Sequence, residues 1–182
     1  MAAGSAAIAY VTHLERDNQF CVACHRPDGE RRLHGQLFAR YESKPPVDLS
    51  ALHHTKKAVK CIDCHGGVGV AGRSRVLAVA AWDTAKYLAG AFKEPDRMMV
   101  PLRDLDCLQC HADYNQSLFP EGGQGGGKDF HKLPEHRVLD GIRCAACHAS
   151  HVAGDPRLGF INNQVVLPLC QRCHREMGQE QQ

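Results

Sequence analysis

The sequence has few of the large side chains that fill an ordinary hydrophobic core. Its 182 residues include only 6 Phe, 4 Tyr and 1 Trp, although 43% of the chain is hydrophobic. A chain of this length suits one modest domain, so something other than aromatic side chains must fill part of the interior. The hydrophobic share, with 23% charged residues, excludes an intrinsically disordered chain.

The sequence also lacks an excess of charge of either sign. It has 22 Lys and Arg residues against 20 Asp and Glu residues, which gives a formal net charge of +2. Proteins that bind nucleic acids present a strongly basic surface to the phosphates. We therefore expect no nucleic-acid partner.

No cysteine is left for a framework of disulfide bonds, because all 10 belong to one repeated motif. The motif is Cys-x-x-Cys-His, the pattern of c-type haem attachment, and it occurs five times. We expect five covalently bound haem c groups, each bonded to both cysteines of its unit. The attachment residues are Cys21 and Cys24, Cys61 and Cys64, Cys107 and Cys110, Cys144 and Cys147, and Cys170 and Cys173.

The histidine that ends each motif is expected to bind the haem iron from one side, as the proximal ligand. The five proximal ligands are His25, His65, His111, His148 and His174. The alternative is structural zinc on the cysteine pairs. It would need four ligands per ion and does not explain why a histidine follows every pair.

Seven further histidines are candidates for the opposite, distal side of the irons, which is two more than five haems require. His13, His53 and His136 each precede the first cysteine of a unit by eight residues. This regular offset suggests a functional placement, although His54 competes with His53. We expect one of His53 and His54 to be a ligand.

The other distal candidates follow no common offset. His151 lies three residues after His148, too close to bind the same iron, so we expect it to reach a neighbouring haem. The two further candidates are His34 and His131. A methionine, Met98 or Met99, is a weaker alternative ligand for the haem of the third motif.

Five motifs leave about 36 residues per haem, so every segment must touch a porphyrin. We expect a mainly α-helical chain with much irregular loop, little or no sheet, and a core formed by stacked haems. The best helix candidate away from the motifs covers about Ser74 to Phe92, with Ser74 as N-cap and Pro95 closing it. We divide the chain into an N-terminal helix, residues 1–19, and a pentahaem cytochrome c domain, residues 20–182.

Haem attachment of this type takes place outside the bacterial cytoplasm, so an export signal or an anchor is expected. Residues 1–12 contain no Lys or Arg, whereas a signal peptide begins with a positive region. The apolar run Ala2–Val11 is about half of the roughly 20 residues that a membrane span needs. We interpret residues 1–19 as the end of a membrane anchor or, alternatively, as a helix with no membrane role.

Three segments resemble the NapC/NirT/NrfH family of membrane-anchored multihaem cytochromes. They are NQFCVACH at 18–25, VKCIDCHG at 59–66, and GIRCAACH at 141–148 with His151 downstream. Members of that family take electrons from membrane quinol and pass them along a haem row to a periplasmic reductase. The resemblance implies the same role here, on the periplasmic side of a bacterial membrane. The layout also resembles pentahaem subunits of alternative complex III type assemblies.

The favoured function is therefore single-electron transfer by a carrier, not an enzyme. We expect a donor and an acceptor protein, membrane quinol as a further candidate, and membership of a larger complex. One alternative is a subunit of a polymeric extracellular cytochrome wire. Another is a multihaem reductase with one open haem, but nitrite reductases of that type commonly replace the histidine of one unit by lysine, and no unit here does so.

Overall fold

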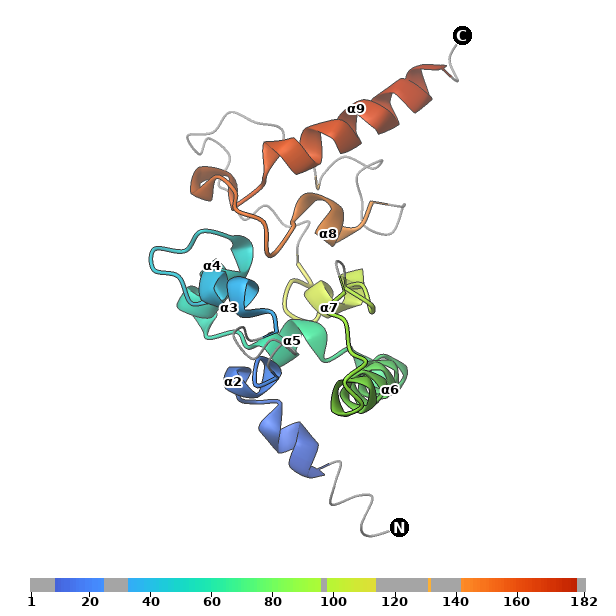
Figure 1. Cartoon of the computed structure of the whole chain (residues 1–182). Coiled ribbons are helices and arrows are strands. Elements are labelled where there is room, and N and C mark those ends of the chain that lie inside the picture. Colours follow the sequence, from blue (N-terminus) through green and yellow to red (C-terminus); the bar gives the residue numbers. More distant parts are fainter. Residues whose placement is uncertain (1–8, 25–32, 96–97, 114–130, 132–141, 180–182) are drawn as a thin grey trace.

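The computed structural model describes residues 9–24, 33–95, 98–113, 131 and 142–179. Within these ranges the chain is helical and contains no β-strand, and its single isolated bridge joins Asp155 to Ile161. The expected fold class, mainly α with irregular loops and little or no sheet, is confirmed. Residues 9–14 and helix α9 lie at opposite ends of the molecule (Figure 1).

The described helices after residues 9–14 range from one turn to 20 residues. They are α2 (Asn18–Cys21), α3 (Gly35–Tyr41), α4 (Leu49–Lys57), α5 (Cys61–His65), α6 (Gly69–Leu88), α7 (Asp104–Leu108), α8 (Cys144–Cys147), the 3-10 helix η4 (Pro156–Leu158) and α9 (Asn163–Gln179). None of them combines the length and the hydropathy that a membrane-spanning segment requires.

The helices that carry the first four Cys-x-x-Cys-His motifs have only four or five residues, so they depend on local hydrogen bonds at their first turn. In α5 a carboxylate oxygen of Asp63 accepts a hydrogen bond from the backbone N–H of Lys60 at 2.8 Å. In α7 Asp106 does the same for Arg103, also at 2.8 Å. These carboxylates satisfy backbone donors that a helix of one turn cannot pair internally.

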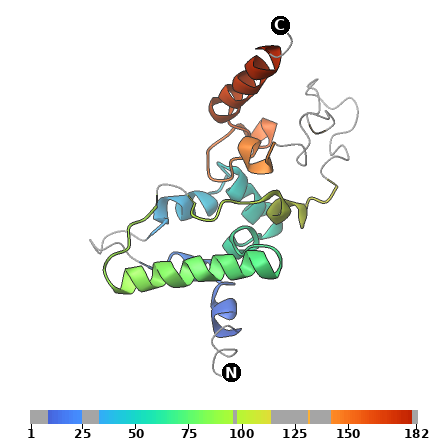
Figure 2. The same cartoon turned by 90° about the vertical axis from the view of Figure 1, so that its right-hand side faces the viewer.

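The long helix away from the motifs is confirmed, but both of its predicted ends are wrong. It begins at Gly69 rather than near Ser74, and it ends at Leu88 rather than Phe92. Gly90 has a φ of 68°, and the N–H groups of Gly90 and Ala91 donate to the carbonyls of Tyr87 and Lys86. This Schellman turn ends α6 before Pro95 is reached. Figure 2 shows α6 along its full length, running across the row of short motif helices.

Few side chains of the described residues are fully removed from water. The buried hydrophobic residues are Val22, Leu33, Tyr41, Ala51 and Phe160, and the buried polar residues are Glu15 and Asp48. A self-sufficient domain of this length would bury many more apolar side chains. The polypeptide therefore leaves a large part of its interior to be filled by something else.

A hydrogen-bond network centred on Tyr41 joins three of the helices. The Tyr41 hydroxyl donates to the Val59 carbonyl at 2.7 Å and accepts from Nδ2 of Asn18 at 2.8 Å. Oδ1 of Asn18 in turn accepts the backbone N–H of Cys61 at 3.0 Å. Tyr41 thus fixes α3 against α2 and against the start of α5.

Replacement of this tyrosine tests the network. We expect Tyr41→Phe to lower the free energy of unfolding by about 1–2 kcal/mol, because the part-buried partners of its hydroxyl lose their hydrogen bonds. Denaturant unfolding of the haem-loaded protein measures the change. Tyr10→Phe is the matched control, since Tyr10 is 64% exposed and such surface changes stay within about 0.5 kcal/mol. Equal stability of the two variants would contradict the role given to Tyr41.

Candidate cofactor-binding site

All ten cysteines carry free thiols, as attachment to a cofactor requires. Cysteines of consecutive motifs lie next to each other. A hydrogen bond with Cys61 raises the pKa of the Cys21 thiol far above its usual range, with desolvation adding to the shift. Desolvation, with smaller contributions from Cys107 and other charged neighbours, raises the pKa of Cys64 to about 11. These thiols are therefore protonated at neutral pH.

The same adjacency continues towards the C-terminus. Desolvation, together with hydrogen bonds to Asp104 and Cys107, raises the pKa of Cys144 to about 12. Desolvation also raises the pKa of Cys147, with Cys170 as the neighbouring thiol. Each of the first four attachment sites therefore has a cysteine of the next motif beside it.

The helices that carry the motifs pack in the order of the chain: α2 against α5, α5 against α7, α7 against α8, and α8 against α9. Side-chain hydrogen bonds join three of these four helix pairs. Oδ1 of Asn18, on α2, accepts the backbone N–H of Cys61, and Oδ1 of Asp104, on α7, accepts that of Cys144 at 2.8 Å. Between them, Nε2 of Gln109 donates to the Asp63 carbonyl at 2.9 Å. The attachment sites form one row, which can be followed from α2 to α9 in Figure 1.

Three motif histidines each face a histidine from outside the motifs. The ring centres are 6.1 Å apart for His65 and His151, and 5.9 Å apart for His111 and His53. The third pair is His148 and His131, with ring centres 6.0 Å apart. A metal held by two imidazoles from opposite sides, with a bond of about 2 Å to each nitrogen, places the ring centres about 6 Å apart. The distance between the ring centres of each pair is compatible with one metal ion between the two rings.

His53 is further oriented by its own helix, α4. Its Nδ1 lies 2.8 Å from the Leu49 carbonyl, which makes Nδ1 the protonated nitrogen and leaves Nε2 as the free electron-pair donor. His54, the next residue, instead packs on Tyr41 with ring centres 4.2 Å apart. The structure thus separates the two competing histidines: His53 faces a motif histidine, and His54 supports Tyr41.

Three of the paired imidazoles, those of His65, His148 and His151, are held in the neutral form that binds a metal. Desolvation, aided by the neighbouring His151, lowers the pKa of His65 to about 4. Desolvation likewise lowers the pKa values of His148 and His151. No proton has to be removed from these rings before they coordinate.

Four other predicted ligands, His13, His25, His34 and His136, do not belong to these three pairs. His25 and His136 lie outside the described residues. His13 lies within the helical segment 9–14, and His34 is the N-cap of α3, with its Nδ1 2.9 Å from a carboxylate oxygen of Glu94. The fifth motif lies inside α9, where its cysteines and His174 follow Pro168.

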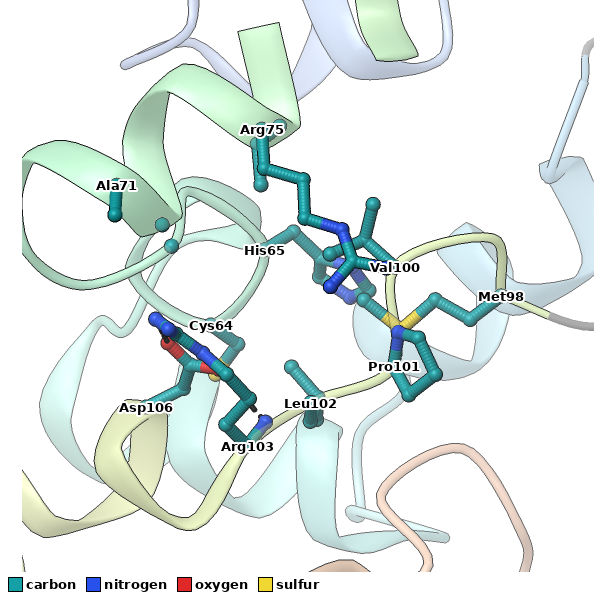
Figure 3. A pocket seen from close by; sticks show the side chains of 13 residues that line it. Cys64, His65, Ala71, Arg75, Met98, Val100, Pro101, Leu102, Arg103 and Asp106 are labelled. Carbon is teal, nitrogen blue, oxygen red and sulfur yellow. Dashed lines mark hydrogen bonds and ion pairs between the residues drawn. The ribbon is translucent and has the colours of Figure 1, made fainter. Parts of the chain in front are cut away.

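A cavity of about 200 Å³ opens beside the second motif, between α5, α6 and the segment 98–103. Cys64 and His65 reach it, and apolar residues such as Val76 and Val100 form much of its wall. Arg75 extends from α6 into the cavity, towards His65 (Figure 3). Arg103 lies at the cavity too, where it contacts Asp106 at 3.4 Å.

A second cavity, of about 510 Å³, lies between α8, α9 and the same segment 98–102. Its walls are mainly apolar, with Ile142, Ala146 and Leu169, and its basic side chains are Arg143 and Arg172. A porphyrin combines an apolar ring with two carboxylates, so walls of this composition suit it. Free thiols, facing imidazoles and these cavities together fit covalently bound haem c. Sequence reasoning missed the four cavity arginines, since no motif marks them.

A comparison with family models matches residues 52–175 to the family described as Cytochrome c3. The matched range is more than half of the chain and contains four of the five motifs. Comparisons with curated proteins and with solved structures give no match. The family match supports a multihaem cytochrome c with covalently bound haem. It does not extend to the narrower NapC/NirT/NrfH resemblance.

Proposed function

The chain belongs to the cytochrome c3 family, and we propose that it relays single electrons along five haem c groups placed in the order of their motifs. The observation that carries this proposal is the packing of each motif helix against the helix of the next motif. Haem c supplies the one-electron chemistry, and the polypeptide sets its spacing, ligation and surroundings. Single-electron transfer requires cofactors close to one another, which a continuous row of attachment sites provides.

We assign three pairs of axial ligands from the facing rings. His151 would serve the group attached at Cys61 and Cys64, opposite His65. The other two sets are Cys107, Cys110, His111 and His53, and Cys144, Cys147, His148 and His131. The first and fifth groups would be held by Cys21, Cys24 and His25, and by Cys170, Cys173 and His174. His13 and His136 remain the candidates opposite them.

The paired ligation favours a carrier over a reductase. An iron that catalyses reduction needs an open position for its substrate, whereas two imidazoles fill both axial positions. At each of the three facing pairs, the two histidines would supply both ligands. Two histidine ligands would keep the iron in nearly the same geometry in its oxidised and reduced states. Little structural reorganisation would then accompany each electron transfer.

The two ends of the row would meet different partners. The α2 end follows the apolar run Ala2–Val11, and we propose a quinol pool or a quinol-oxidising complex as the electron donor there. The α9 end presents the exposed cations Arg172 and Arg175. We propose a periplasmic or extracellular redox protein as the acceptor at this end, with the chain on the periplasmic side of a membrane.

Haem content and spin state test the proposal on one sample. We expect the mass of the purified protein to equal that of the chain plus five haems. The electron paramagnetic resonance (EPR) spectrum of the oxidised protein should show low-spin iron only, because histidines fill both axial positions. Fewer than five haems would refute the full row. A stoichiometric high-spin signal would mark an open iron and favour a reductase.

The neighbouring histidines of α4 provide a matched pair of variants. We expect His53→Ala to convert one haem from low spin to high spin, since His111 loses its facing ring. His54→Ala should leave every spin state unchanged and lower stability by about 1 kcal/mol through lost packing on Tyr41. EPR of the two oxidised variants distinguishes them. A new high-spin signal in His54→Ala, and none in His53→Ala, would reverse the assignment.

A further inference from the structure

Asp48 is a completely buried carboxylate with one oxygen unused. Its exposed fraction is 0%. Oδ1 caps α4 by accepting the backbone N–H of Ala51 at 2.9 Å, and it also accepts the Ser50 hydroxyl at 2.7 Å. Oδ2 is buried and has no hydrogen-bond partner among the described residues. A buried carboxylate oxygen without a partner is costly, so a donor is expected beside it.

His151 likewise has a buried polar atom that is left over, in this case a ring nitrogen. Its Nδ1 is buried and also has no hydrogen-bond partner among the described residues. The ring is close enough to Asp48 for the carboxylate to act on it electrostatically, opposing the desolvation that lowers the pKa of the imidazole. One buried acceptor and one buried ring nitrogen therefore lie in the same part of the interior.

The backbone holds these two residues in register. The Ser50 N–H donates to the Ser150 carbonyl at 2.9 Å, and the Gly154 N–H donates to the Val47 carbonyl at 3.4 Å. These bonds bracket Asp48 on one segment and His151 on the other. In addition, the Arg40 guanidinium donates to the His151 carbonyl at 3.2 Å. These bonds hold the segment that carries Asp48 against the segment that carries His151.

We propose that Asp48 is the positioning residue of the His151 ligand in the haem-loaded protein, where Oδ2 would accept a hydrogen bond from Nδ1–H of His151 and Nε2 would bind the iron. This inference rests on the ligand assignment made for His151 above. A histidine ligand commonly donates its second N–H to a carboxylate or carbonyl, which fixes its tautomer and makes it a stronger donor to the metal. A negative charge at this place also stabilises the oxidised iron.

The other distal ligand held near the start of α4, His53, has an uncharged hydrogen-bond acceptor in place of a carboxylate. His53 donates its Nδ1–H to the neutral carbonyl of Leu49, the residue after Asp48. Under the proposal, successive residues of α4 orient the distal ligands of two haems, one through a charged acceptor and one through an uncharged one. Asp48 should therefore lower the reduction potential of the haem bound by His65 and His151, and Leu49 should have a weaker effect on the haem bound by His111.

The test is Asp48→Asn in the full haem-loaded protein. Asparagine caps a helix as well as aspartate does, so the α4 cap is kept while the charge and the second acceptor oxygen are lost. We expect one of the reduction potentials in an EPR-monitored redox titration to move upwards, and the largest g value of the same low-spin centre to change. If Asp48→Asn does not take up haem, Asp48→Ser, which also caps the helix, is measured instead. Unchanged potentials in the loaded variant would overturn the proposal.

Asp155→Asn is the matched control. Asp155 caps η4 by accepting the Arg157 N–H at 2.9 Å, and its side chain is 31% exposed. It undergoes the same change of charge without a buried histidine partner, and we expect no comparable shift. An equal shift in both variants would assign the effect to net charge alone and refute the specific role of Asp48.

His151→Ala separates this inference from the ligand assignment. We expect one haem to become high-spin in that variant. If every haem stays low-spin, the assignment of His151 fails, and the inference about Asp48 fails with it. If a haem becomes high-spin but Asp48→Asn shifts no potential, the ligand assignment stands and only the role of Asp48 is overturned.

Discussion

Hydrogen bonds from the first cysteine of a motif to a side chain of the preceding motif helix fix two of the four steps of the row. The backbone N–H of Cys61 is held by Asn18, and that of Cys144 by Asp104. Helices of four or five residues have no stability of their own in water. Their positions therefore depend on such ties and on the cofactors attached to them, more than on a conventional core.

Much of the site could be predicted from the sequence because covalent haem attachment has a local signature. The five motifs identify their cysteines and the histidine that follows each pair. The distal partners have no such signature, since they come from distant parts of the chain. The regular offset of eight residues selected His53 but says nothing about which ring it faces. His53 precedes the second motif, yet it lies against His111 of the third.

The helical fold class could also be predicted from the sequence, but the ends of the helices and the contacts of their side chains could not. The sequence predicted the long helix α6, but the residue at which it ends depends on the left-handed conformation of Gly90. Similarly, His53 and His54 are equivalent in sequence, and only the packing of Tyr41 under one of them distinguishes their roles. The cavity arginines have no pattern at all, because they come from four separate segments.

The packing of each motif helix against its successor has a consequence for throughput. If electrons pass through the haem groups one after another, the slowest transfer step limits the overall rate. Loss of one haem would then interrupt transfer along the whole row. A branched arrangement of haem groups tolerates such a loss, because electrons can take another path. In this chain, a change at a central helix such as α7 would therefore have an effect out of proportion to its five residues.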